Sequence, residues 1–246
     1  MSVITPIMQL EAASWIENQI VELPDRAKYR AYSAVRSLKW ANDIYKADMP
    51  IPACFCALHA TEEAVAAFIS CAKVRGYADA KCINITDHAE KATVSLLAQK
   101  VSNILQPYKI ALALDPNQDV LVSRHIVDGK VYYNEASATL FHFLDDKGDM
   151  SPDFYEELVE TFGNVDELIS AVRLGQKARN EIFYATSTGY PTGFDTPEEL
   201  LIRECQLSLG LIWGAVDINR NGDQLIPFFS QALQTAKILV GKLKKR

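Results

Sequence analysis

Two charged residues stand on stripes of the sequence that otherwise predict buried helix faces. In residues 51–75, apolar side chains spaced three and four apart form a stripe that includes Glu62. In residues 164–185, a similar stripe includes Arg179. A buried carboxylate needs a cation or a proton, and arginine keeps its charge inside a protein. We therefore predict a Glu62–Arg179 ion pair between two packed helices, which either fixes their register or lines a cleft that carries out chemistry.

Other polar residues accompany these two. His59 and Glu63 lie four residues apart, on a strip of the same helix beside Glu62. Asp87 and Lys91 have the same spacing in the next expected helix, on the side that carries its apolar residues. If the helices pack together, these side chains form a cluster of acids, cations and hydrogen-bonding groups. Such clusters bind phosphate or transfer protons, although they also serve as purely structural networks.

Three segments carry a resemblance to a known family. They are residues 54–76 ("CFCALHATEEAVAAFISCAKVRG"), 86–92 ("TDHAEKA") and 177–193 ("KARNEIFYATSTGYPTG"). In order and spacing these segments resemble the HEPN helical superfamily, and in particular its abortive-infection AbiV-type branch. The matching positions are a Glu-Glu pair at Glu62 and Glu63, a His-x-x-Lys at His88 and Lys91, and an arginine followed by an aromatic-tyrosine pair at Arg179, Phe183 and Tyr184.

The resemblance implies a HEPN-like helical bundle and a bacterial antiphage-defence or toxin-type protein. Many HEPN proteins are metal-independent ribonucleases that form homodimers, in which an arginine and a later histidine of each chain face one cleft. By this resemblance Arg179 binds the phosphate and Asn180 positions it, while Tyr184, Glu62 and His59 complete the catalytic group. Lys91, His88 and Glu63 are then expected to bind the substrate.

The sequence departs from the family at the position of the motif histidine. Tyr184 stands there, no histidine follows it, and a tyrosine with a pKa of about 10 is a poor base near neutrality. His59 or His88 could replace the missing group if the fold brings one of them to Arg179. Three interpretations therefore remain open: an endoribonuclease, a non-catalytic HEPN-like module that dimerises and binds RNA or a partner protein, and a helical interaction protein outside the superfamily.

Composition excludes several other classes. The chain has 246 residues and a formal charge of -6, which argues against an unspecific nucleic-acid binder, and no DNA partner is expected. The N-terminus lacks a signal-peptide pattern, and no apolar run is long enough for a membrane span, so we expect a cytoplasmic protein. Five cysteines without zinc spacing, the absence of paired Glu-x-x-His motifs and the absence of a phosphate-binding loop predict neither metal nor cofactor.

The periodicity predicts a mainly α fold in a single helical domain, residues 1–246, with a small inserted β-hairpin or three-stranded meander at about 109–134. Asp128-Gly129 between β-branched runs predicts a hairpin turn. We expect Thr86, Asn164 with Glu167, and Thr196 to cap helices. The expected helices cover residues 6–21, from after Pro24 to about 45, 51–75, from 86 to about 105, 151–162, 164–185, 196–218 and from 223 to the end.

Overall fold

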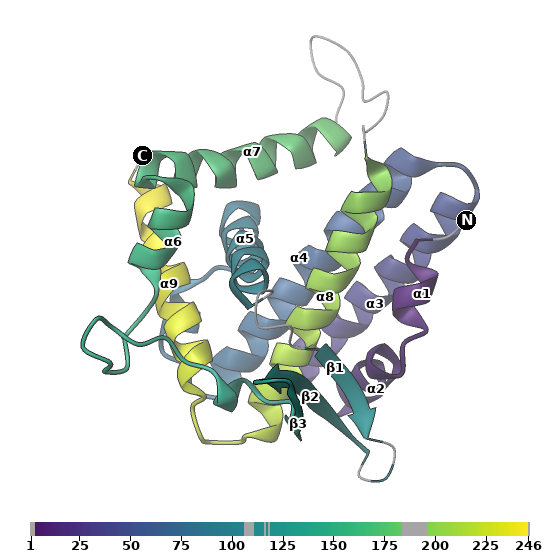
Figure 1. Ribbon diagram of the computed structural model, residues 1–246. Coiled ribbons are helices and arrows are strands. Elements are labelled where there is room, and N and C mark those ends of the chain that lie inside the picture. Colours follow the sequence, from purple (N-terminus) through teal and green to yellow (C-terminus); the bar gives the residue numbers. More distant parts are fainter. Residues whose placement is uncertain (1–2, 106–110, 116, 118, 184–195, 246) are drawn as a thin grey trace.

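The computed structural model describes residues 3–105, 111–115, 117, 119–183 and 196–245, and within these it is mainly helical with one small antiparallel sheet (Figure 1). The expected fold class is therefore confirmed. The helices are α1 (Thr5–Met8), α2 (Glu11–Gln19), α3 (Asp25–Lys46), α4 (Pro50–Val74), α5 (His88–Leu105), α6 (Tyr155–Phe162), α7 (Val165–Phe183), α8 (Pro197–Arg220) and α9 (Pro227–Lys244), with short 3-10 turns η1 (Ile20–Glu22), η2 (Asp79–Cys82) and η4 (Ala138–Leu140). The strands are β1 (Ala111–Asp115), β2 (Val120–Val127) and β3 (Lys130–Glu135).

Helix α4 lies at the centre of the protein. It packs along α3 on one side and along α8 on the other, and it also contacts α5 and α7. Small side chains allow these close contacts, because alanines at spacings of three and four keep the helix surface low. The fully buried alanines of α4 are Ala53, Ala57, Ala60, Ala64, Ala66, Ala67 and Ala72.

By length and composition, α4 is also the one helix of the described residues that could cross a membrane. In this fold, however, 72% of its most apolar window is buried against the other helices. Burial of that kind is the pattern of a core helix, because a membrane span would turn its apolar side chains outward to lipid. The helix is therefore consistent with a soluble protein.

Helix α7 crosses one end of the bundle, and the sheet lies at the opposite end (Figure 1). The sheet has the order β1-β2-β3, with both pairs antiparallel. Asp128 and Gly129 join β2 to β3 with φ values of 50° and 76°, which are the two left-handed residues of a type I′ hairpin turn. The predicted meander is therefore confirmed. Leu121 of β2 is buried in the core, and the indole of Trp15 donates to the carbonyl of Asp119, so the sheet is held against α2.

Several helix starts differ from the sequence prediction, and α9 begins at Pro227 and not at about 223. The first expected helix, residues 6–21, is broken at Leu10, whose extended backbone (ψ 139°) separates α1 from α2. Ile4, which precedes α1, and Ala13 of α2 join a small cluster with Leu38, while Trp15 of α2 joins the main core, so α2 contributes to both clusters.

Two further differences are at the starts of α5 and α6. Asp87, and not Thr86, caps α5: its Oδ1 accepts hydrogen bonds from the backbone N–H groups of Ala89 and Glu90 at 2.7 and 3.1 Å. Helix α6 begins at Tyr155 and not at Ser151, and Asp153 accepts a hydrogen bond from the N–H of Tyr155. At α7 the predicted cap is confirmed, with Asn164 accepting from the N–H of Glu167. Thr196 precedes α8 as expected, but its side chain makes no capping hydrogen bond.

Candidate functional site

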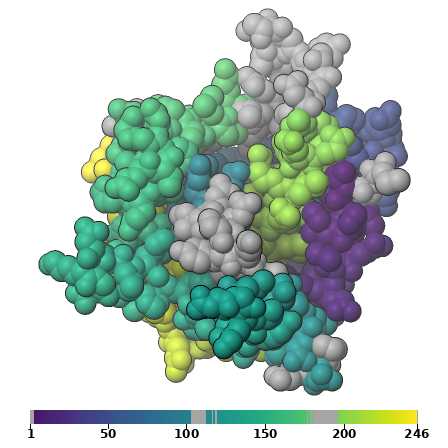
Figure 2. Space-filling model, viewed as in Figure 1, coloured from purple at the N-terminus to yellow at the C-terminus, as the bar shows by residue number. Residues whose placement is uncertain are grey.

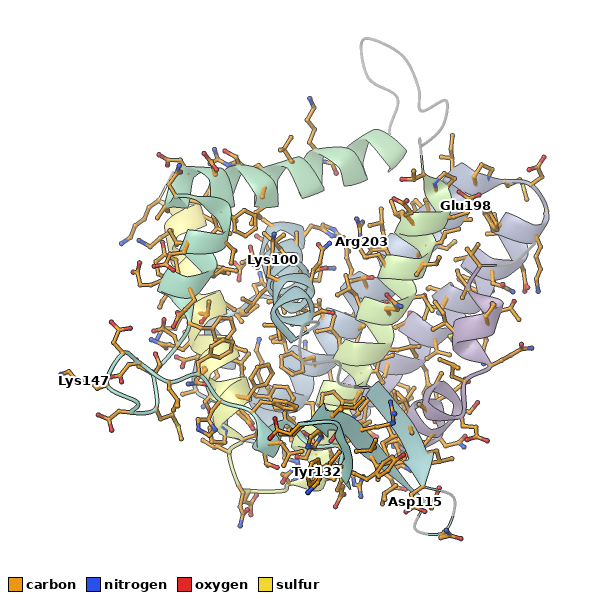
Figure 3. All side chains as sticks on the ribbon, in the orientation of Figure 1. Lys100, Asp115, Tyr132, Lys147, Glu198 and Arg203 are labelled. Carbon is orange, nitrogen blue, oxygen red and sulfur yellow. The ribbon has the colours of Figure 1, made fainter. Side chains whose placement is uncertain are left out.

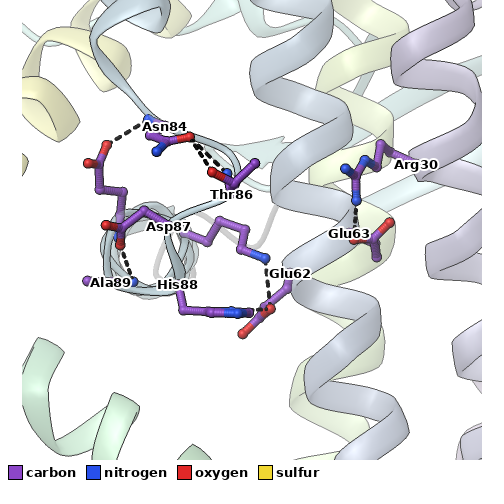
Figure 4. Close-up of polar contacts among 10 residues, drawn as sticks. Arg30, Glu62, Glu63, Asn84, Thr86, Asp87, His88 and Ala89 are labelled. Carbon is purple, nitrogen blue, oxygen red and sulfur yellow. Dashed lines mark hydrogen bonds and ion pairs between the residues drawn. The ribbon is translucent and has the colours of Figure 1, made fainter.

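The carboxylate of Glu62 is shared by two residues of α5. Its Oε2 accepts a hydrogen bond from Lys91 Nζ at 2.8 Å and lies 2.8 Å from His88 Nδ1 (Figure 4). The side chains of Lys91 and Glu62 are 7% and 12% exposed, whereas that of His88 is 54% exposed. The ammonium therefore balances the carboxylate inside the protein, while the imidazole lies at the surface of the same group.

The start of α5 sets this geometry. Because Asp87 caps the helix, His88 and Lys91 fall in its first turn, three residues apart and on one face. Glu90 lies between them in sequence and makes different contacts: it accepts from the N–H of Asn84 and pairs with Lys244 of α9 at 2.6 Å. Contacts on both faces thus fix the turn that presents His88 and Lys91 to α4.

The Glu62–His88 contact is a carboxylate–imidazole pair. A carboxylate that holds one ring nitrogen orients the ring and directs the other nitrogen away from the pair. In hydrolases this arrangement lets the outer nitrogen accept or donate a proton near neutral pH. His88 Nδ1 faces Glu62, so Nε2 is the atom available for proton transfer.

A cavity of about 170 Å³ adjoins this group, between α4, α5, α7 and α8. Figure 2 shows the region as a hollow between α7 and α8, with α5 at its floor. Its described charged lining consists of two cations and two carboxylates, Glu62, Lys91, Arg203 and Glu204. Apolar and small residues of the four helices complete the described wall, among them Leu58, Ala171, Val172, Gly175 and Leu207.

Arg203 and Glu204 form a second ion pair in this cavity. Both Nε and Nη2 of Arg203 donate to Glu204 Oε1, at 2.9 and 2.7 Å. The other oxygen of Glu204 accepts from the hydroxyl of Thr61 at 2.6 Å, and the side chain of Glu204 is 5% exposed. Arg203 lies on the side of α8 that faces α5 (Figure 3).

The other residues predicted for the site are not all brought to this group. Glu63 lies on the opposite side of α4, where its carboxylate accepts from Arg30 of α3 at 2.7 Å. His59 is half-buried one turn before Glu62, and among the described residues no hydrogen bond or ion pair joins it to that group. Asn180 is exposed on α7.

Two predicted residues fall outside what the structure describes. They are Tyr184 and the side chain of Arg179. The Glu62–Arg179 pair therefore stays a prediction. The backbone of α7 does extend to Phe183, and position 179 follows Gly175, a residue of the cavity lining, by four residues. Residues four apart share a helix face, so position 179 is on the same face of α7 as Gly175, which lines the cavity.

Sequence reasoning missed Thr61, Arg203 and Glu204. A signal for Glu204 was present, because it lies on α8 between the buried positions Leu201 and Ser208, as Glu62 lies on a stripe of α4. Once Glu204 is placed in the interior, a cation such as Arg203 is expected beside it, since a buried carboxylate needs a cation. Nothing local indicates Thr61, whose role depends on the packing of α4 against α8.

Three of the cysteines are buried, and their burial affects the protonation of their thiols. Burial raises the pKa of Cys54 to about 11 and the pKa values of Cys71 and Cys205 to about 12, so these thiols are protonated at neutral pH. Across the described ranges, no group of three or more histidine, cysteine, aspartate or glutamate side chains is placed to hold a metal ion.

We compared the chain with known proteins, and no family profile, curated protein or solved structure matches it.

Proposed function

We propose that this protein is a HEPN-like effector of bacterial antiphage defence that cleaves RNA without a metal ion, and that His88 supplies the acid–base group. The observation that carries the proposal is the Glu62–His88–Lys91 group at the edge of a cavity that α7 also lines. In the sequence, Tyr184 occupies the position of the motif histidine. A carboxylate-oriented imidazole on α5 supplies the proton-transfer group that this position lacks.

The reaction that fits these groups is attack of a ribose 2′-hydroxyl on the adjacent phosphate. His88 Nε2 accepts the proton of the 2′-hydroxyl as the new P–O bond forms, and the bond to the 5′-oxygen breaks. The leaving 5′-oxygen takes a proton from solvent water, and the imidazolium of His88 returns its proton to solvent. The products are a 2′,3′-cyclic phosphate and a free 5′-hydroxyl. Glu62 holds the ring and stabilises the imidazolium that the proton transfer creates.

The charges of the cavity explain why Arg179 belongs to the proposal. The two described cations of the lining, Lys91 and Arg203, are each paired with a carboxylate, so the described lining carries no net positive charge, and only Nη1 of Arg203 is left outside these pairs. Arg179 would supply this charge from α7, and Asn180 would position the phosphate beside it. In the transition state, the positive charge that develops on His88 would add to the charge of Arg179.

The test combines growth with analysis of RNA. Wild type, His88→Ala and Arg179→Ala are induced in bacteria, together with His125→Ala, a control histidine that stacks on Tyr132 in the sheet. We expect wild type and the control to arrest growth and degrade RNA, and both site variants to lose these effects. Purified wild type should cleave an all-ribose oligonucleotide in EDTA and spare its 2′-deoxy analogue. Intact RNA with wild type, or equal cleavage by His88→Ala, would refute the proposal.

A second candidate is the non-catalytic module that forms a homodimer and binds a partner protein or RNA. The observation that favours it is the outer face of α3, where three aromatic residues, Tyr29, Tyr32 and Trp40, are 67%, 42% and 50% exposed. Exposed aromatic side chains at helical spacing are typical of protein interfaces. This candidate predicts a dimer by light scattering that Trp40→Ala converts to monomer, with RNA left intact; a monomeric wild type would exclude it.

A further inference from the structure

A second cavity among the described residues has no part in the proposed reaction. It has a volume of about 590 Å³ and lies between α5, α8 and α9, with residues of the sheet and of η4 completing its described wall. This volume falls in the range of about 300 to 1,000 Å³ that is usual for small-molecule sites. Most of the wall is apolar, including Phe68, Val94, Phe141, Trp213 and Phe229.

Two of the three charged and amide groups of this wall, Gln99 and Arg203, lie where it meets the site cavity, and the third, Gln206, follows Arg203 by three residues on α8. Gln99 of α5 and Arg203 and Leu207 of α8 line both cavities. At the sheet, by contrast, the hydroxyls of Ser123 and Ser137 already donate to partners within the protein, the carbonyl of Asn134 and the carboxylate of Asp217. A ligand with an apolar body would therefore find its polar contacts at the end near Arg203.

The charge of the wall indicates what the polar end of the ligand is. Arg203 is the single cation of the described lining, which contains no carboxylate. Its pair with Glu204 uses Nε and Nη2, so the Nη1 group remains for a ligand. Glu204 belongs to the lining of the smaller cavity alone, on the other side of the guanidinium. Arginine binds carboxylates through charge-assisted hydrogen bonds, which are stronger than those between neutral groups.

We propose that this cavity binds an amphipathic monocarboxylic acid of the fatty-acid class. The carboxylate accepts hydrogen bonds from Arg203 and Gln99, and the apolar chain fills the space between α5, α8 and α9. This site is distinct from the Glu62–His88–Lys91 group, and its occupation does not depend on RNA cleavage.

One glycine offers a way to block the cavity. A Cβ atom added at Gly210 would meet no other atom within 4 Å, although Gly210 is part of the wall. A large side chain at this position therefore enters the open space without a clash at its base, and replacing a glycine inside a helix favours the helix. Gly241 of α9 has the same open surroundings but is not part of the wall, so Gly241→Phe is a matched control.

The test measures binding of dodecanoate and 1-dodecanol to the full chain by calorimetry. We expect wild type and Gly241→Phe to bind dodecanoate and Gly210→Phe to lose this binding. Arg203→Gln should weaken dodecanoate binding by about 10- to 100-fold, the usual effect of losing a hydrogen bond to a charged group, and should leave dodecanol binding unchanged. Arg220→Gln, which removes an exposed arginine of the same helix, is its control.

A second measurement uses the unmodified protein. Trp213 lines the cavity, so 12-bromododecanoate should quench its fluorescence, and Trp213→Phe should remove that quenching while Trp15 and Trp40 remain. Absence of dodecanoate binding by wild type, equal binding by Gly210→Phe and wild type, or equal sensitivity of acid and alcohol to Arg203→Gln would each overturn the proposal.

Discussion

Glu62 and Glu63 are neighbours in sequence, yet α4 presents them to opposite sides. Glu63 faces α3, where Arg30 binds its carboxylate within a continuous helix–helix contact. Glu62 faces α5, where it holds a buried lysine and a half-exposed histidine next to a cavity. Both carboxylates satisfy the same requirement for a cation, but only the second is near open space and a titratable ring.

This difference shows that burial of a charge does not by itself identify a functional site. The Arg30–Glu63 pair can fix the register of α3 on α4 and needs no other role. Around Glu62, the cation neutralises the carboxylate and the histidine adds an outward nitrogen that nothing in the packing requires. We therefore expect substitutions on the α5 side to change activity and substitutions on the α3 side to change stability.

Under the proposed function, the largest expected effect is that of His88→Ala on the rate of RNA cleavage. Loss of a general acid–base usually lowers a rate by about 10²- to 10⁴-fold. Because the ring is more than half exposed, its removal should leave the unfolding midpoint nearly unchanged. Single-turnover cleavage and urea unfolding of the purified variant measure both quantities. A drop in stability with an unchanged rate would place His88 with the structural residues and remove the contrast between the two sides.

The next effect is on stability at the α3 side. Arg30→Ala leaves the carboxylate of Glu63 buried without its cation, which should lower the free energy of unfolding by about 3 kcal/mol. Lys28→Ala is the control, since Lys28 pairs with an exposed Asp25 and should change stability by about 0.5 kcal/mol or less. Urea unfolding compares the two variants. If Arg30→Ala and Lys28→Ala lower the free energy of unfolding equally, the Arg30–Glu63 pair stabilises the protein no more than a surface pair does.

The fold was predictable where one short segment determines the structure. Asp128 and Gly129 suit a type I′ turn whatever surrounds them, and the pair formed by Asn164 and Glu167 is a local cap. The start of α5 shows the limit of such reasoning. Asp87 and Thr86 are both good caps by type, and the choice depends on Asn84, which accepts hydrogen bonds from the N–H and hydroxyl of Thr86.

The candidate site was predictable only in part, because its contacts join distant helices. The apolar stripe of α4 correctly indicated that Glu62 is shielded from water, but periodicity says nothing about which helix faces it. Its observed cation is Lys91, 29 residues away, and the register of α5 on α4 decides that contact. Glu63 was assigned to the same cluster as Glu62, although a rotation of 100° per residue allows neighbours to face different helices.

A smaller effect is expected within the Glu62 group itself. Glu62→Gln and Lys91→Met each remove one partner of a shielded ion pair, so the double variant should be more stable than the sum of the single changes indicates. We expect a coupling energy of about 2 kcal/mol for Glu62 with Lys91. For Glu62 with His88→Ala, whose ring is half exposed, it should be about 0.5 kcal/mol. Equal coupling energies would mean that the histidine, like the lysine, serves mainly to hold α5 against α4.

The smallest effect concerns Asp217, another buried carboxylate, which is held by hydrogen bonds from the N–H of Ala138 and the hydroxyl of Ser137. Burial raises its pKa above the usual 3.8, although the Ala138 N–H opposes the shift. The folded protein therefore binds this proton more tightly than the unfolded chain, and the stabilisation it provides is complete below pH 3.8 and lost as the pH rises through the folded pKa.

Asp217→Asn keeps the acceptor oxygen without titrating. The unfolding free energy of wild type should thus fall relative to that of the variant as the pH rises from 4 to 7 in urea titrations. A parallel pH dependence of the two proteins would contradict this prediction, because it would mean that the hydrogen bonds to Asp217 offset its burial.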